Sequence, residues 1–232
     1  MKSPAGNTAQ PFQVKDCSLI TLSTGLRART LRELRERIGE CEVECLDYHF
    51  FATKLRPAFD DPEYPNDFAA WAGHTLGDRA LAERLSMINP FDYSDAEELR
   101  EATIALIQDS LDEQEHILWA RQRHEFIFLR SQIVTLDTGL RPASPAEMGK
   151  LIPALSTGSV YYHFVEARRR VPGGRDDFSA WIEGSGPGYE RLGVQLGLID
   201  YYFCSLSELR DRVAGVFQDF QGESSIPKGR RA

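Results

Sequence analysis

Two copies of a short motif carry the residues best suited to chemistry. The tripeptide Tyr-His-Phe occurs at residues 48–50 and again at 162–164, and an arginine follows each histidine by seven positions. Positions seven apart share one face of a helix, so each histidine projects beside its arginine. Histidine titrates near neutral pH, and an aspartate further along each half could orient its ring, so a polar ligand pocket is one interpretation. The two candidate sets are His49, Arg56 and Asp67, and His163, Arg170 and Asp177.

A structural role explains the same residues without any ligand, and it is the interpretation we favour. A histidine that borders an apolar helical stripe is usually a hydrogen-bonded core residue. Asp67 and Asp177 stand at the expected starts of short helices, where a capping carboxylate contributes about 0.5–2 kcal/mol. Both sets are equally intact, which favours structure or symmetric binding over catalysis in one half.

Two arginines near helix starts are candidates for anion binding. Arg27 and Arg141 each follow the tripeptide Thr-Gly-Leu and lie three residues before an expected helix N-cap. A guanidinium there could hold a phosphate or carboxylate together with the exposed N–H groups of the helix start. The alternative is that each arginine pairs with a neighbouring carboxylate.

Aromatic pairs are a third twinned feature. Trp71 lies three residues after Phe68, and Trp181 lies three residues after Phe178, so each pair shares a helix face. Large aromatic side chains dominate the burial of protein cores, and we interpret both pairs as core anchors. Stacking of a flat ligand on a tryptophan is the alternative.

Familiar catalytic and metal-binding signatures are absent from the sequence. It has no Gly-rich nucleotide-binding loop, no Walker A motif, no nucleophile elbow and no His-Glu-x-x-His zinc motif. Glu113 and His116 have the spacing of a di-iron ligand pair, but they occur once, in an acidic run better explained as a solvated helix face. We therefore predict no catalytic residue, no cofactor and no metal.

The two halves of the sequence align with each other, and this internal similarity is the most informative property of the sequence. An offset of 114 residues superposes LITLSTGLR at 19–27 on IVTLDTGLR at 133–141, with twelve identities between residues 17 and 58. After a contraction the offset becomes 110, and DFAAW at 67–71 aligns with DFSAW at 177–181. Ordered identities of this kind indicate an internal duplication.

The elements of each half follow from hydrophobic periodicity and turn residues. Ser18 to Leu22 alternates like a short strand, and Thr24 with Gly25 predicts a turn out of it. Helical patterns follow, among them 43–56 and 159–170, which carry the two histidines. The expected fold class is mainly α, or α+β at most: two tandem helical repeats, each with one short strand, related by a pseudo-two-fold axis across which the strands pair. We expect a mobile segment at 1–16, repeat 1 at 17–108, a helical connector at 109–126, repeat 2 at 127–221 and a mobile tail at 222–232.

Composition excludes several classes of protein. Hydrophobic residues make up 42% and charged residues 27% of the chain, as in ordinary globular proteins. A net charge of −8, without a basic run longer than three residues, argues against nucleic-acid binding. No apolar stretch approaches the length of about 20 residues that spans a membrane, and the start lacks a signal peptide, so we expect a cytoplasmic protein with no membrane contact. Free thiols are expected at Cys17, Cys41, Cys45 and Cys204.

One family shares the pattern of these motifs. TGLR, then DYHF or YYHF, then an arginine, then NDF or DDF with a tryptophan three positions on, resembles the bacterial and archaeal family called domain of unknown function 5752. The resemblance covers about residues 17–220 as two tandem copies, and the second copy departs from the pattern between Gly184 and Gly197. The family has no assigned activity, so the resemblance implies continuity of the fold and no catalytic role.

Two classes of function remain open at this point. The favoured hypothesis is a non-catalytic binding or regulatory module, monomeric or homodimeric, for an unknown protein partner or a small-molecule anion. The alternative is a small-molecule enzyme or sensor that acts on a phosphate or carboxylate ligand through a His/Arg/Asp set. An enzyme would have one set converging in a concave pocket while its twin drifts into packing.

Overall fold

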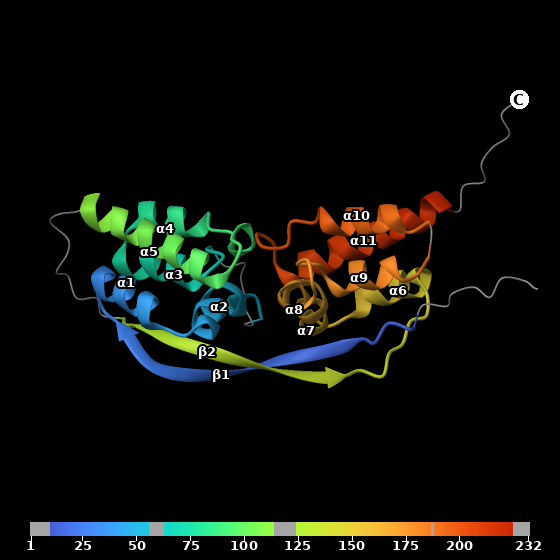
Figure 1. Ribbon diagram of the computed structural model, residues 1–232, viewed down its shortest axis with the longest axis horizontal. Helices are drawn as coiled ribbons and strands as arrows, with labels where there is room; N and C mark the ends of the chain where they lie inside the picture. The colour runs from blue at the N-terminus through green and yellow to red at the C-terminus, as the bar shows by residue number, and fades with distance from the viewer. Residues whose placement is uncertain (1–9, 56–62, 114–123, 187, 225–232) are drawn as a thin grey trace, which may run out of the picture. The chain divides into compact units, whose positions relative to one another are not determined.

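The chain folds into two compact units that together contain many short helices and one sheet. The computed structural model describes residues 10–55, 63–113, 124–186 and 188–224. The first-half unit comprises Leu19–Ile133, and the second-half unit comprises Met1–Ser18 with Val134–Ala232. The expectation of a mainly helical or α+β fold is confirmed (Figure 1). None of the described helices is long and apolar enough to cross a membrane.

Two long strands form the sheet, and each strand contributes to both units. β1 (Lys15–Ala28) pairs with β2 (Phe126–Asp137) in a two-stranded sheet. Just before β1, the N–H groups of Phe12 and Val14 donate to the carbonyls of Pro142 and Leu140, which is an antiparallel register. The boundary between the units falls inside both strands, so each unit contains one end of β1 and one end of β2.

β1 is longer than the strand expected at Ser18–Leu22. Thr24 and Gly25 do not form a turn: the backbone continues through Gly25 at a φ of 82°, and the Thr24 hydroxyl donates to the Phe128 carbonyl at 2.7 Å. Turn chemistry is a local signal, whereas the hydrogen bonds that extend β1 come from a strand far along the sequence. In the segment where we expected mobility, Phe12 and Val14 are held by backbone hydrogen bonds with residues 138–142, which follow β2.

Short helices separated by tight connections make up the rest of each unit. Among the described residues, π-helical turns occur at Ala72–Leu76 and at Tyr161–Glu166, and the latter joins α7 to α8 within the helix expected at 159–170. In the first half the corresponding helix, α2, continues into a 3-10 turn at Ala52–Leu55. The described helices of the first-half unit are α1 (Leu31–Glu40), α2 (Val43–Phe51), α3 (Asp67–Trp71), α4 (Arg79–Ser86) and α5 (Ala96–Glu113). Those of the second-half unit are α6 (Pro145–Leu151), α7 (Thr157–Val160), α8 (Ala167–Arg170), α9 (Asp177–Glu183), α10 (Glu190–Gly197) and α11 (Leu206–Ser224).

The caps of α3 and α9 lie one residue earlier than expected. The Asn66 side chain accepts from the Ala69 N–H at 2.9 Å, and the Asp176 side chain accepts from the Ser179 N–H at 2.8 Å. Both capping residues are buried. The prediction that Asp67 and Asp177 are these caps is therefore wrong. They occupy the first helical position, and their carboxylates make a different contact, with His49 and His163.

Each unit has a core of its own, and the helices that carry the histidines face it as expected. Leu46 and Phe50 of the first stripe are buried, and so are Val160, Phe164 and Ala167 of the second. The side chain of Thr53, the third member of the first stripe, lies outside the described part of the chain. Residues of β2 complete the core of the first-half unit, with Phe126 and Phe128, and residues just before β1 complete that of the second, with Phe12 and Val14.

Gly158 in α7 packs too closely against the start of β1 to accept a side chain. A β-carbon there would lie 2.3 Å from Asp16 Oδ1 and 2.5 Å from the Cys17 carbonyl oxygen. Gly158→Ala is expected to lower the free energy of unfolding by about 1–3 kcal/mol, because backbone atoms must move to make room. Urea denaturation measures the change. The control is Gly215→Ala in α11, where a β-carbon meets no atom within 4 Å and the higher helix propensity of alanine predicts an unchanged or higher stability. Equal midpoints for the wild type and Gly158→Ala would contradict the close packing.

Candidate functional site

His49 and Asp67 meet in the interior of the first-half unit. The Nδ1 atom of His49 on α2 lies 2.7 Å from Asp67 Oδ2 on α3, and its Nε2 atom accepts from the Leu129 N–H on β2 at 3.0 Å. An Nε2 atom that accepts carries no hydrogen, so the ring proton is on Nδ1 and points at the aspartate. The ring, which is 2% exposed, thereby connects two helices and a strand.

His163 makes the equivalent contacts in the second-half unit. Its Nδ1 atom lies 2.6 Å from Asp177 Oδ2, and its Nε2 atom accepts from the Lys15 N–H at 2.8 Å. Arg170 also donates to Asp177 Oδ2, at 2.5 Å, and lies over the Tyr162 ring at 4.1 Å. The structure thus brings together all three members of the second candidate set. In the first set it brings together His49 and Asp67, and Arg56 lies outside the described residues.

Aromatic rings surround both imidazoles. The His49 ring lies 4.7 Å from Phe126 and 5.4 Å from Phe68, and the His163 ring lies 4.8 Å from Phe12 and 5.7 Å from Phe178. These distances are typical of packed aromatic clusters.

The two tryptophans belong to these clusters. Trp71 packs on Phe126 at 5.9 Å and donates its ring N–H to the His124 carbonyl at 3.1 Å. Trp181 packs on Phe12 at 5.5 Å and donates to the Gln10 carbonyl at 2.8 Å. The Trp71 indole therefore holds the chain just before β2, and the Trp181 indole holds it a few residues before β1. This favours the interpretation of both tryptophans as core anchors.

The histidine sets have little capacity for chemistry in this arrangement. Both ring nitrogens of His49 and of His163 bond to protein atoms, so neither ring presents a free nitrogen to a ligand or a substrate proton. General acid or base catalysis needs such a nitrogen within hydrogen-bond reach of the reacting group. The geometry favours the structural interpretation of these residues.

Arg27 and Arg141 pair with carboxylates, which is the alternative to anion binding. Arg27 lies 3.1 Å from Glu125, and hydrogen bonds from Arg29 and Arg27 lower the pKa of that carboxyl. Arg141 lies 2.5 Å from Asp137 and, with a backbone N–H, lowers the pKa of that carboxyl to about 2. Each charge is already matched by a neighbour, which leaves a weaker attraction for an external anion.

The described residues form no metal site around Glu113, which has the spacing of a di-iron ligand pair with His116. Glu113 pairs with Arg84 at 2.7 Å, and His116 lies outside the described residues. Within the described ranges there is no group of three or more His, Cys, Asp or Glu side chains placed to hold a metal ion.

A cavity in the second-half unit was not foreseen from the sequence. It has a volume of about 670 Å³ and lies between α9 and α10. Ile182, Tyr189 and Val194 give it apolar walls, and glycines at 186, 193 and 197 border it. Volumes of about 300–1,000 Å³ are usual for small-molecule sites.

Arg168 and Asp176 form the buried polar end of this cavity. The Arg168 guanidinium lies over the rings of Phe164 and Tyr201, at 4.9 and 4.3 Å. Its hydrogen bonds are long, 3.3 Å to the Gly174 carbonyl and 3.5 Å to Asp176, and its buried Nε–H has no partner. A guanidinium with weak or missing partners retains the capacity to bind an acceptor.

Burial sets the protonation behaviour of Asp176. Loss of water around the carboxyl raises its pKa, although the Ser179 N–H and hydroxyl donate to it at 2.8 and 2.7 Å and oppose that shift. Carboxyls with raised pKa values in concave sites are frequent at ligand-binding positions. Asp176 therefore caps α9 and also faces the cavity.

At the wall of the cavity, α10 carries a glycine where α4 carries a side chain. Both helices bury two leucines one turn apart, Leu81 and Leu85 in α4 and Leu192 and Leu196 in α10. The residue after the first leucine is the buried Ala82 in α4 but Gly193 in α10, where a β-carbon would meet no atom within 4 Å. The signal in the sequence was the glycine-rich stretch between residues 184 and 197, which the sequence analysis treated only as a departure from the family pattern.

Removal of either buried histidine should destabilise the protein. His49→Ala and His163→Ala are each expected to lower the free energy of unfolding by about 2–4 kcal/mol, because the substitution removes the imidazole that bonds to an aspartate and to a strand N–H and opens a cavity. Chemical denaturation of the purified variants measures the loss. His74→Ala is the control, because the His74 side chain is 59% exposed in its pair with Glu63 and should contribute little. Wild-type stability in His49→Ala would exclude the bridging role.

Similar proteins identify the family of this chain and support its fold. No curated protein matches the chain. The solved structure of OrfY from Thermoproteus tenax is similar, with a TM-score of 0.74 and 29% identity over 93% of this chain and 97% of that one. A family model described as a family of unknown function, DUF5752, matches residues 9–218, and it runs through both halves without dividing them into two copies. The chain therefore belongs to the DUF5752 family.

Proposed function

We propose that the chain is a non-catalytic binding module that holds a small molecule in the cavity between α9 and α10. The observation that carries the proposal is the cavity of about 670 Å³ with the weakly hydrogen-bonded Arg168 guanidinium at its polar end. The bonds of the Nη atoms, at 3.3 and 3.5 Å, are long, and a ligand acceptor at normal hydrogen-bond distance would form a stronger one. The apolar walls would contribute the remaining affinity through burial.

The charges around the cavity narrow the chemistry of the ligand. Arg168 and Arg175 contribute positive charge, whereas Asp176, Glu183 and Glu190 contribute carboxylates. Arg175 is already paired with Glu183. Such a lining repels a multiply charged anion and suits a neutral or zwitterionic molecule with an acceptor for Arg168 and a donor for Asp176. This class replaces the small-molecule anion that the sequence alone favoured.

The histidine sets support binding over catalysis. The second set converges as an enzyme site would. However, both ring nitrogens of His163 already bond to protein atoms, and Asp177 bonds to Arg170 as well as to His163. Among the described residues that line the cavity there is no histidine, cysteine or lysine. A small-molecule enzyme is for these reasons the weaker hypothesis.

The internal duplication is part of the same proposal. His49 and His163 make the same kinds of contact. Their strand partners, Leu129 and Lys15, lie 114 residues apart, and their aspartate partners lie 110 residues apart, which are the two offsets found in the sequence. We infer that two tandem repeats, at 17–108 and 127–221, descend from one ancestor and that glycines of the second repeat help to form the ligand cavity. The pseudo-two-fold axis, a protein partner and a monomeric or homodimeric state stay predictions.

A cavity-filling substitution tests the proposed site. The probes are free amino acids, nucleosides and inorganic phosphate in a thermal-shift assay. An amino acid or a nucleoside is expected to stabilise the wild type by about 2.7 kcal/mol at a hundredfold excess over its Kd, with no effect of phosphate. Gly193→Leu should abolish this shift without loss of stability, since its side chain enters open space and glycine is the poorer helix former.

The matched control is Gly215→Leu in α11, which also places a leucine in open space but does not line the cavity. It should retain the full ligand-induced shift. A shift that survives in Gly193→Leu would place the ligand elsewhere. If phosphate stabilises the protein and neither amino acids nor nucleosides do, the argument that the carboxylates of the lining repel an anion is wrong.

A further inference from the structure

The outer edge of β1 carries backbone groups that no other strand pairs. In an antiparallel sheet, residues alternate between those that bond to the neighbouring strand and those whose N–H and C=O point away from it. Just before β1, Val14 bonds through both groups to residues that follow β2, and the N–H of the next residue, Lys15, points away and donates to an imidazole. By the same alternation Leu19, Thr21 and Ser23 point away from β2. The sheet formed by the described residues has no third strand beside them.

Local hydrogen bonds mark both ends of this open stretch. The Cys17 N–H donates to the side chain of the preceding residue at 2.8 Å, and the Gly25 N–H donates to the Ser23 hydroxyl at 3.4 Å. The N–H groups of the three outward residues between them meet no acceptor in the described part of the chain. The open stretch therefore covers residues 19–23, and its middle residue is Thr21.

The helices α1 and α2 of the first-half unit leave this edge uncovered. His49 on α2 bonds to the Leu129 N–H, which lies on the outer edge of β2. These helices therefore meet the sheet from the β2 side, and β1 is the far strand of this unit (Figure 1). Thr21 and Ser23 are accordingly exposed.

The open stretch has none of the charges that protect most strand edges. Natural proteins commonly place lysine or another charged residue on an exposed edge, which prevents pairing with a second strand. In β1 no residue from 17 to 26 is charged, although charged residues make up 27% of the chain. The aligned stretch of β2 ends in Asp137, which pairs with Arg141. Of the two edges, the one on β1 is thus better suited to accept another strand.

Two exposed apolar side chains flank Thr21 on one face of the strand. Ile20 is 49% exposed and Leu22 is 40% exposed. The positions that align with them at the offset of 114, Val134 and Leu136, are exposed and apolar as well. Solvent-facing strand positions are ordinarily polar, so apolar residues at all four favour a face that another protein covers.

The open stretch of β1 is complementary to itself. When two copies pair antiparallel about a two-fold axis at Thr21, that residue lies opposite its own copy, and Leu19 lies opposite the partner's Ser23. Ile20 then lies opposite the partner's Leu22, so four exposed apolar side chains form one cluster. About six backbone hydrogen bonds join the two strands, one for each N–H of the two open stretches. A register shifted by two residues would include an N–H that already has an acceptor.

We propose that residues 19–23 of β1 form the interface of a homodimer, in which two copies of this chain make a four-stranded sheet with the order β2–β1–β1–β2. A partner attracted by charge finds no opposite charge on this edge, whereas a second copy matches each apolar residue and each outward backbone group. The interface is small, so the dimer exchanges with the monomer, with a Kd of about 10–100 µM. The proposal does not depend on the ligand cavity, which lies in the second-half unit.

Analytical ultracentrifugation of the full-length protein tests for the dimer. Over about 2–200 µM, which brackets the expected Kd, the average mass should rise from that of one chain toward that of two. Two copies of net charge −8 repel each other outside the edge, so a rise from about 50 to 500 mM NaCl should tighten the dimer severalfold. The mass of one chain throughout, or a dimer that weakens with salt, would overturn the proposal.

Paired substitutions locate the interface, because β2 offers an aligned control for each. Thr21→Pro removes the central outward N–H and spares the bonds to β2, since proline is tolerated on sheet edges. Leu22→Lys leaves the backbone unchanged and adds a charge to the apolar cluster. Each is expected to raise the Kd at least about tenfold, whereas Thr135→Pro and Leu136→Lys should dimerise like the wild type. Wild-type affinity in the folded β1 variants, or loss of the dimer in the β2 variants, contradicts the proposal.

Cross-linking measures the register independently. The four native cysteines are buried, so Thr21→Cys places one reactive thiol on the two-fold axis. A short bismaleimide is expected to join Thr21→Cys into a covalent dimer and to leave Thr135→Cys monomeric. A covalent dimer that forms equally well in both variants would exclude a specific contact at the β1 edge.

Discussion

A buried imidazole must find a partner for each ring nitrogen, and this requirement organises both units. In each unit one partner is an aspartate in the first turn of a short helix, and the other is a strand N–H far away in sequence, 80 residues from His49 and 148 residues from His163. Helix, strand and the following helix are thus held by one ring. The aspartates can serve because the preceding residues, Asn66 and Asp176, take over the capping of α3 and α9.

Local sequence signals predicted the helical content and the buried face of each histidine helix, because hydrophobic periodicity reports directly on burial. They also brought the right residues into the candidate sets, although the decisive contacts are made with the strands. Thr24 and Gly25 illustrate why prediction stopped there. Their turn propensity is real, but hydrogen bonds from a distant strand decide the conformation, and no local pattern encodes that partner.

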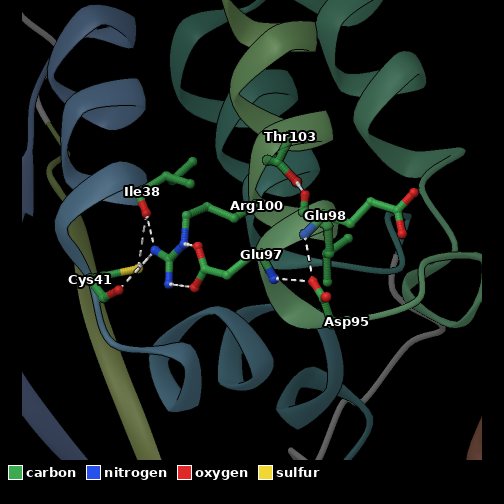
Figure 2. A network of polar contacts seen from close by, with 8 residues as sticks. Ile38, Cys41, Asp95, Glu97, Glu98, Arg100 and Thr103 are labelled. Atoms are coloured by element: carbon green, nitrogen blue, oxygen red, sulfur yellow. Dashed lines mark hydrogen bonds and ion pairs between the residues drawn. The ribbon is translucent and has the colours of Figure 1, made fainter.

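The cavity shows a different limit of sequence reasoning. The glycines between residues 184 and 197 were visible, but glycine is equally consistent with a broken helix and with a helix that leaves room beside it. What distinguishes the two is the pair of leucines that keeps α10 packed while Gly193 leaves space. In the same way Arg100 donates to the Cys41 carbonyl in one half (Figure 2) and Arg210 donates to the Leu155 carbonyl in the other, although the residues around the two arginines differ.

The division of each strand between the two units affects how the chain is made. The first-half unit lacks its share of β2 until residue 133 has been synthesised, whereas residues 10–18 are made well before their packing partners in the helices beyond residue 144. This segment includes Phe12 and Val14, which are buried in the folded protein. It must remain unpaired while the whole first-half unit is synthesised, so the longest exposure to aggregation or to chaperones falls on this segment.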